Sequence, residues 1–229
     1  MIRLYSKERA RRIIARQDSW IQSLSRRYML PAACLQAILE MEIAGIDLLD
    51  VLADLAVEFY WARYALRRRL QRLGLVRSAL PLLRRGVFGK RDSSTGYAQI
   101  FAYVGINAVN FALDGRYADA ETLGLAALGL GTACCLDPDD PDTLCRVWHA
   151  LHRNRRFNLE LAALNLLAAA EEMTGRVDFA HYSDREMMLV LTRYNAKVKT
   201  VTPYGREAYA CYLRYSAALS PPAAPESGG

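Results

Sequence analysis

The sequence lacks any apolar run long enough to cross a membrane without a charged residue. A membrane-spanning helix needs about 20 consecutive, mostly apolar residues, and each apolar stretch of this chain is interrupted sooner. The N-terminal segment, MIRLYSKERARRIIARQDSW, also lacks the uninterrupted apolar core of a secretory leader. We therefore expect no membrane span, no cleaved leader and synthesis in the cytoplasm, with the route to any place of action outside the cell left open.

Cysteine and histidine are sparse and show none of the spacings of a zinc site. The five cysteines include no CxxC pair, and only three histidines accompany them. Cys34 and Cys211 lie in apolar helical contexts, where a buried free thiol is the ordinary interpretation. A phosphate-binding glycine loop is absent as well. The sequence therefore predicts no disulfide framework, no metal site and no cofactor.

Alternating polar and apolar residues, the pattern of strands, are almost missing from the 229 residues, whereas helical periodicity recurs throughout. With 52% hydrophobic residues the chain can bury a substantial core. The final segment, SPPAAPESGG, offers nothing to pack. We expect a mostly α fold, with one helical domain over residues 1–218 and a disordered tail over residues 219–229.

Local start signals place several of these helices. Asp47 is a candidate N-cap, Asp140 precedes Pro141 at a first helical position, and Ser183 with Glu186 forms a capping box. The expected helices cover residues 7–27, 30–45, 47–73, 97–113, 140–153, 157–174, 183–195 and 203 onward, with short helical pieces at 80–83 and within 114–131.

Acidic residues are absent between Phe59 and Arg91, where ten Arg or Lys occur in a chain of net charge +6. Such a basic block can contact an anionic polymer: nucleic acid, a lipid surface or a cell-wall glycan. We expect an anionic wall or membrane contact through four of its arginines: Arg67, Arg68, Arg69 and Arg72. The structural alternative is that these side chains form the solvent-facing side of a helix. A nucleic-acid-binding protein is a weaker hypothesis, because no recognition helix or aromatic stacking platform is evident.

Two glutamates fall at the end of the helix expected over residues 30–45. Projected at about 100° per residue, Glu42 lies in line with Leu35 and Leu39, whereas Glu40 points toward water. A carboxyl group on an apolar stripe is partly desolvated, and desolvation raises its pKa. A carboxyl that stays protonated near neutral pH can give its proton to a leaving group. The alternative role of Glu42 is a structural ion pair with an arginine.

Three segments, taken in chain order, carry motifs of one superfamily. They are AILEME at 37–42, GYAQIFAYVGINA at 96–108, and LTRYNA at 191–196 followed by YGREAYACY. In order and rough spacing they resemble the lysozyme-like superfamily, in particular its lytic transglycosylase and goose-type lysozyme branches. The chain departs from that pattern at Ile43, where the transglycosylases usually carry serine, and in the long interval from Glu42 to Gln99.

The resemblance implies a single lysozyme-like helical domain, with the basic block as an extended helical insertion. It implies cleavage of the β-1,4 glycosidic bond of peptidoglycan or a related amino-sugar polymer, by hydrolysis or by transglycosylation. Glu42 would be the catalytic acid. Gln99, Tyr194 and Asn195 would bind the sugar, and Tyr97 could stack on a sugar face. The alternative is a non-catalytic, all-helical interaction module on the same scaffold.

A glycosidase usually needs a second carboxylate, and three aspartates are candidates for it. Asp92 lies in the polar loop KRDSSTG, and Asp47 follows Glu42 by five residues, with Asp50 close behind. Each has a structural alternative: an Asx-turn or helix cap for Asp92, and first-turn caps for Asp47 and Asp50. Lytic transglycosylases can work with one glutamate, so this role can also be empty.

Overall fold

Helices account for the regular secondary structure of the part of the chain that the structure describes. The computed structural model describes residues 2–75, 90–131 and 135–219. Over those ranges the chain forms nine α-helices and no sheet, and its only bridges are the isolated pairs Arg3–Asp47 and Thr95–Ile100. The predicted all-α, single-domain class is confirmed.

The helices are α1 (Lys7–Ala15), α2 (Asp18–Tyr28), α3 (Ala32–Gly45), α4 (Leu48–Arg72), α5 (Ala102–Asp114), α6 (Pro141–Arg153), α7 (Arg155–Thr174), α8 (Asp184–Asn195) and α9 (Pro203–Leu219). The described ranges also contain the 3-10 turns η3 (Leu125–Leu128) and η4 (Phe179–His181).

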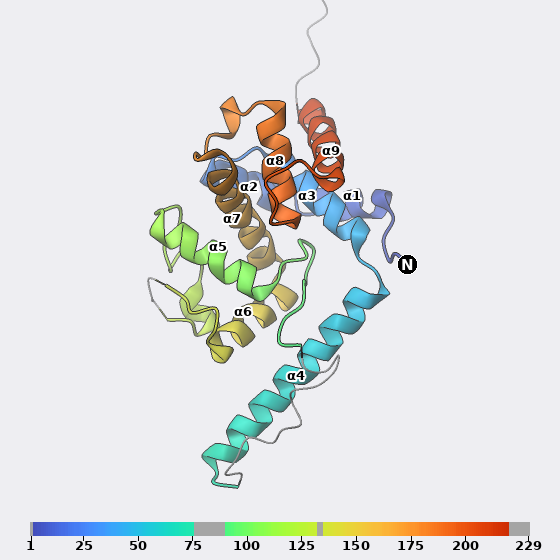
Figure 1. Ribbon diagram of the computed structural model, residues 1–229. Coiled ribbons are helices and arrows are strands. Elements are labelled where there is room, and N and C mark those ends of the chain that lie inside the picture. The colour runs from blue at the N-terminus through green and yellow to red at the C-terminus, as the bar shows by residue number, and fades with distance from the viewer. Residues whose placement is uncertain (1, 76–89, 132–134, 220–229) are drawn as a thin grey trace, which may run out of the picture.

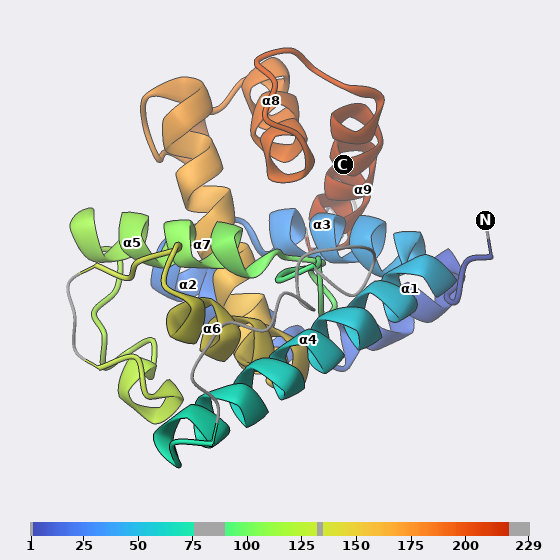
Figure 2. The ribbon, with the colours of Figure 1, turned by 60° about the horizontal axis from the view of Figure 1, so that its bottom comes forward.

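Helices α3 and α7 form the centre of the molecule. Every residue from Ala32 to Glu40 and from Phe157 to Leu167 is buried, because neighbours cover these helices on all sides. Helix α3 packs against α1, α2 and α9, and α7 packs against α2, α5, α6 and α8 (Figures 1 and 2). The C-terminal ends of α3 and α8 thereby come together on one side of the core.

Helix α4 leaves the end of α3 and runs along one edge of the molecule beside α6 (Figures 1 and 2). Only its inner face is buried, through Ala56, Val57, Tyr60 and Trp61. Two ion pairs join α4 to opposite ends of α6, Glu58 with Arg153 at 2.6 Å and Arg68 with Asp142 at 2.7 Å. The basic block therefore begins on a projecting helix, and its residues 76–89 lie outside the described residues.

The local start signals are confirmed. Asp47, Asp140 and Ser183 are the N-caps of α4, α6 and α8, and each accepts a hydrogen bond from a backbone amide of its helix. Cys34 and Cys211 are buried free thiols, as expected. The expected helical piece at 80–83 and the tail beyond Leu219 lie outside the described residues.

Several predicted boundaries are wrong. The helix expected over 7–27 is two helices, which change direction at Gln17 so that α1 and α2 each bury their own apolar face. The helix expected from 97 begins only at Ala102, after a tight turn. The helical piece within 114–131 reduces to η3, because Gly124 and Gly129 on either side adopt left-handed backbone conformations, at φ +64° and +69°.

The prediction that Glu40 points toward water is also wrong. Its side chain is fully buried and binds Arg11 (3.1 Å), Arg214 (2.7 Å) and the Tyr215 hydroxyl (2.7 Å), joining α3 to α1 and α9. Burial alone would raise the pKa of Glu40, but the hydrogen bonds from Arg11 and Tyr215 and the two arginine charges outweigh it and lower the pKa. Glu40 is therefore an ionised structural residue.

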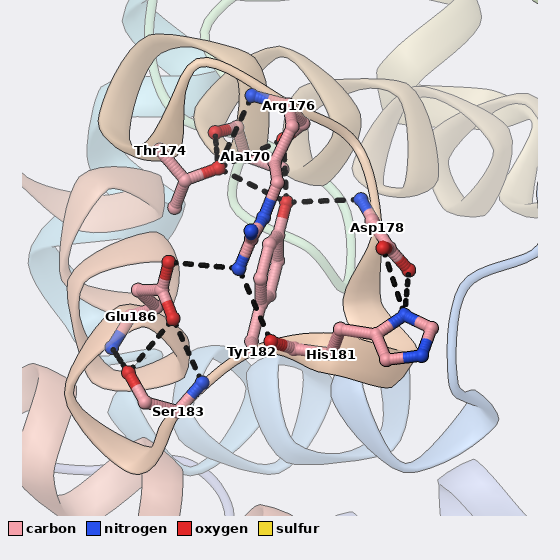
Figure 3. Close-up of polar contacts among 8 residues, drawn as sticks. All are labelled: Ala170, Thr174, Arg176, Asp178, His181, Tyr182, Ser183 and Glu186. Carbon is pink, nitrogen blue, oxygen red and sulfur yellow. Dashed lines mark hydrogen bonds and ion pairs between the residues drawn. The ribbon is translucent and has the colours of Figure 1, made fainter.

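The connection from α7 to α8 is fixed by a compact set of polar contacts (Figure 3). Arg176 donates to Glu186 (3.0 Å) and to the His181 carbonyl (3.1 Å). The Tyr182 hydroxyl donates to the Arg176 carbonyl, and Glu186 closes the capping box with Ser183. These contacts hold the connection and the first turn of α8, while the rest of α8 packs against α7 and α9.

Candidate functional site

A cleft of about 420 Å³ lies where the ends of α3 and α8 meet α5, the second half of α7 and the segment 94–101. Four of the predicted site residues line it: Glu42, Gln99, Tyr194 and Asn195. Three predicted residues do not line it: Asp47, Asp92 and Tyr97. Residues from more than half the length of the chain thus converge on one concavity.

Glu42 stands in the last turn of α3, half-buried at the wall of the cleft. Its Oε1 accepts a 2.5 Å hydrogen bond from the Tyr204 hydroxyl, and no cation of the described chain forms an ion pair with it. Burial raises the pKa of Glu42 to about 7; the Tyr204 hydrogen bond opposes this rise, and the negative charge of Asp50 adds to it. At neutral pH this carboxyl therefore exists in both protonation states.

Helix α9 brings Tyr204 to this position by an unusually close approach to α8. A Cβ added at Gly205 would lie 1.9 Å from Thr192 Oγ1 and 2.7 Å from the Met188 carbonyl oxygen. Only glycine allows the first turn of α9 to approach α8 this closely. Gly205 therefore positions its neighbour Tyr204 against Glu42.

Asp50 is the aspartate candidate that lines the cleft together with Glu42. One of its oxygens accepts the Asp47 backbone amide at 2.9 Å, which closes the capping box of α4. Asp47 is 95% buried and uses its Oδ1 to cap Leu49 and Asp50. Of these two candidates, only Asp50 presents a carboxylate to the cleft.

Asp92 caps α5 from the preceding loop. Its two oxygens accept the backbone amides of Ala102 (2.9 Å) and Tyr103 (3.0 Å). Burial raises the pKa of Asp92 to about 6, despite these hydrogen bonds, which favour the charged form. The helix-cap alternative thus describes its contacts, and its catalytic role stays a prediction.

Gln99 reaches the cleft from a tight turn. Its own φ is +46°, and its Nε2 donates to the Gly96 carbonyl at 2.8 Å. The buried Asn158 of α7 holds the turn, donating to the Thr95 carbonyl (3.1 Å) and accepting the Ala98 amide (2.9 Å). The geometry of this part of the cleft is therefore set by the core helix α7.

A second set of polar contacts joins the extended residues just before this turn to α4. Ser93 and Thr95 both donate to the carboxylate of Asp54, at 2.7 and 2.9 Å. The Thr95 hydroxyl also contacts His152 Nδ1 at 2.8 Å, and Trp148 Nε1 donates to Ser93 Oγ at 3.1 Å. The turn is thus held between α4, α6 and α7.

Tyr194 and Asn195 are the last two residues of α8, and both line the cleft. The Tyr194 hydroxyl donates to the Ala98 carbonyl at 2.8 Å, which links α8 to the Gln99 turn. Burial, with the nearby charge of Glu42, holds the pKa of Tyr194 well above its usual range. Asn195 is exposed and lines the cleft. Tyr97 lies away from the cleft, with Arg155 5.3 Å above its ring.

The structure adds cleft residues that the sequence interpretation did not name. Phe101 and Tyr103 are 40% and 39% exposed, and Lys197 lies over the Tyr103 ring, 5.6 Å from its centroid. Arg193 pairs with Glu172 at 2.6 Å. The hydrogen bond from Arg193 lowers the pKa of Glu172, so this second cleft glutamate is ionised. Both aromatic residues lie within the segment 96–108 that carries the resemblance, so their position in that segment could have identified them as cleft candidates.

The raised pKa of Glu42 predicts a pH-dependent effect of Glu42→Gln on stability. As pH rises from 4.5 to about 7, the unfolded chain releases this proton while the folded chain keeps it, so the wild type loses stability over that range. Glutamine cannot ionise and can still accept the Tyr204 hydrogen bond. We expect equal melting temperatures near pH 4 and a variant more stable at pH 8 by about 3 kcal/mol, or roughly 6–12 °C. A difference in melting temperature that does not vary with pH would contradict the burial of this carboxyl.

Among the described residues, no cluster of three His, Cys, Asp or Glu side chains could hold a metal ion, and no helix combines the length and apolarity of a membrane span. Comparisons of the chain with protein-family models, with curated proteins and with solved structures found no match.

Proposed function

We propose that this protein cleaves the glycosidic bonds of peptidoglycan or a related amino-sugar polymer, on a lysozyme-like helical scaffold. The observation that carries the proposal is Glu42, a half-buried carboxyl with a pKa near 7 and no ion-pair partner in the described chain, at the wall of a cleft. A general acid works best when its pKa lies near the working pH. The structural ion pair considered as an alternative belongs to Glu40 instead.

The chemistry assigned to Glu42 is proton transfer to the leaving oxygen of the scissile bond. As that oxygen takes the proton and the bonding electron pair, positive charge develops at the sugar carbon. The Asp50 carboxylate, also on the cleft, stabilises that charge. The ionised Glu42 then takes a proton from the attacking group, which is water in hydrolysis or a hydroxyl of the same sugar in transglycosylation.

Substrate binding is assigned to the polar and aromatic groups around the two carboxyls. The amides of the exposed Asn195 and of Gln99 provide donors and acceptors for sugar hydroxyl and N-acetyl groups. Phe101 offers a partly exposed ring on which a sugar can stack, whereas Lys197 lies over the Tyr103 ring, 5.6 Å from its centroid. Tyr194 supports the site from within, because its hydroxyl is bound to the Ala98 carbonyl.

The direct test is incubation of the full chain with purified peptidoglycan of several wall types. Clearing of the suspension, with release of fragments that end in either a reducing or an anhydro sugar, supports the proposal and identifies the reaction. A folded wild-type protein that binds these walls without releasing fragments would favour the non-catalytic interaction module. Absence of both binding and cleavage on all walls would refute the substrate class.

Asp50→Asn is expected to lower kcat about tenfold to a hundredfold with little change in KM, because the charge it removes acts on the transition state. The same substitution removes a negative charge near Glu42, lowers the pKa of Glu42, and so moves the alkaline limb of the pH–rate profile to lower pH. Asparagine can still accept the Asp47 amide, which preserves the cap.

Asp47→Asn and Asp92→Asn are the matched controls, since neither side chain lines the cleft. Both substitutions should leave the position of the alkaline limb unchanged. If Asp92→Asn moves the limb or lowers kcat more than Asp50→Asn does, the second carboxylate is Asp92.

A further inference from the structure

Exposed leucines follow the outer face of α4 and its C-cap, in two groups separated by the interval from Leu55 to Leu66. At about 100° per residue, Leu48, Leu52, Leu55, Leu66 and Leu73 fall within an arc of about 60°. The structure leaves them between 47% and 64% exposed. This leucine stripe lies opposite the inner face of the helix, where Val57, Tyr60 and Trp61 are buried. Helix α4 is thus apolar on two opposite sides, and within the described residues only the inner one is buried.

Arginines border the stripe on both sides. In the same projection, Arg63 and Arg69 lie about 20° and 40° beyond its two edges, and Arg67 and Arg72 lie further round the helix. Arg67 is half-buried, with its Nε enclosed. From Phe59 to Arg72 the helix contains no acidic residue. Arg68 does not belong to this outer set, because its side chain pairs with Asp142 at the start of α6. The outer side of α4 therefore combines apolar area with arginines that form no ion pair within the described residues.

We propose that this face of α4 binds an anionic lipid surface. A helix that lies in the plane of a membrane interface needs an apolar stripe of this kind flanked by arginine or lysine. Helix α4 has 25 residues and so extends for about 37 Å, enough to lay several leucines into the acyl boundary at once. The arginines beside them meet the lipid phosphates, and each contributes attraction to an anionic membrane.

A second copy of the chain fits the same face less well, because of charge. A parallel pair of α4 helices would place the arginine-rich halves against each other. An antiparallel pair would place them against the first half of α4, whose acidic groups already have partners: Asp50 in the α4 cap, Asp54 with Ser93 and Thr95, and Glu58 with Arg153. Anionic lipid supplies the missing negative charge without this constraint.

The test is co-sedimentation of the full chain with vesicles made of phosphatidylcholine alone or of equal amounts of phosphatidylcholine and phosphatidylglycerol. We expect binding to the anionic vesicles, weakening as salt is raised, and little binding to the neutral ones. Leu55→Gln and Leu66→Gln should each weaken the partition constant about tenfold or more. The double variant Arg69→Gln, Arg72→Gln should weaken it about thirtyfold.

Matched controls come from equally exposed positions on other helices and loops. Leu213→Gln on α9 matches the leucine changes, since Leu213 is 49% exposed. The pair Arg185→Gln, Lys199→Gln matches the change in net charge, and both residues are exposed. These controls should bind vesicles as the wild type does, and none of these measurements requires glycan cleavage.

Two results would overturn the proposal. One is that the wild type does not bind anionic vesicles, or that the variants with stripe substitutions bind them as well as the wild type does. The other is a wild-type dimer in light scattering that Leu55→Gln or Leu66→Gln converts to monomer without a change in vesicle binding, which would make the stripe a contact between copies of the chain.

Discussion

Glu42→Gln is expected to lower the rate of glycan cleavage by about a hundredfold to ten-thousandfold, the usual contribution of a general acid. Glutamine has nearly the same shape and can still accept the Tyr204 hydroxyl, but it has no proton to give the leaving oxygen. The loss should therefore appear in kcat, with a KM close to that of the wild type. Fragment release from peptidoglycan under saturating substrate measures it directly.

The chemistry-matched control is Glu207→Gln, an exposed glutamate on α9 that pairs with Lys7. It should retain full activity. An active Glu42→Gln protein would end the assignment of Glu42 as the acid and leave the cleft as a binding groove.

Tyr204→Phe separates a tuned acid from a carboxyl that only holds substrate. Its hydrogen bond favours the charged form of Glu42, so removing it should raise the pKa of Glu42 further. The alkaline limb of the pH–rate profile, expected near pH 7 in the wild type, should then move to higher pH. Asp50→Asn should move it in the opposite direction, and this pair of opposite shifts is difficult to explain by a general loss of structure.

The features that sequence reasoning predicted well are those determined by near neighbours. The caps at Asp47, Asp140 and Ser183 depend on donors two or three residues away, so their signals are complete within a few positions. Gly175, in a left-handed conformation at φ +71°, ends α7 where the pattern predicted the end of that helix. The predicted helix boundary was missed where the chain changes direction without a proline or glycine, as at Gln17.

The role of Glu40 shows the limit of such reasoning. Its partners Arg214 and Tyr215 lie 174 and 175 residues further along the chain. A single-helix projection treats the face opposite the apolar stripe as solvent, but α3 is a central helix covered on all sides. Because charged partners come from α1 and α9, an ionised carboxylate is stable at a position that the projection assigned to water.

The candidate site was predicted only in part, because most of its residues are distant from one another in the sequence. Glu42 follows from its apolar stripe, whereas Gln99, Tyr194 and Asn195 came only through the family resemblance. Local patterns cannot distinguish among Asp47, Asp50 and Asp92, since all three accept backbone amides near a helix start. Only the path of the chain around the cleft places Asp50 at its wall.

Gly96→Ala is expected to destabilise the protein by about 3–5 kcal/mol and to disorder the Gln99 side of the cleft. Gly96 has a φ of +72°, and a Cβ there would lie 2.3 Å from Asn158 Nδ2 and 2.8 Å from the Leu151 carbonyl oxygen. Asn158 would have to give up the hydrogen bonds that hold the turn. Thermal melting should fall by roughly 6–20 °C, and the activity that remains below the melt should show a raised KM, because Gln99 is displaced.

Gly175→Ala provides the matched control, because Gly175 has nearly the same φ, +71°, with nothing within 4 Å of an added Cβ. It should cost only about 1 kcal/mol, the backbone strain alone, and leave KM unchanged. The double variant Gly96→Ala, Asn158→Ala isolates the part of the steric cost that comes from Asn158: removing that side chain should make Gly96→Ala less costly than it is in the wild type, while the close approach to the Leu151 carbonyl remains. If Gly96→Ala and Gly175→Ala cost the same, the turn is not clamped by α7. The position of Gln99 in the cleft would then need another cause.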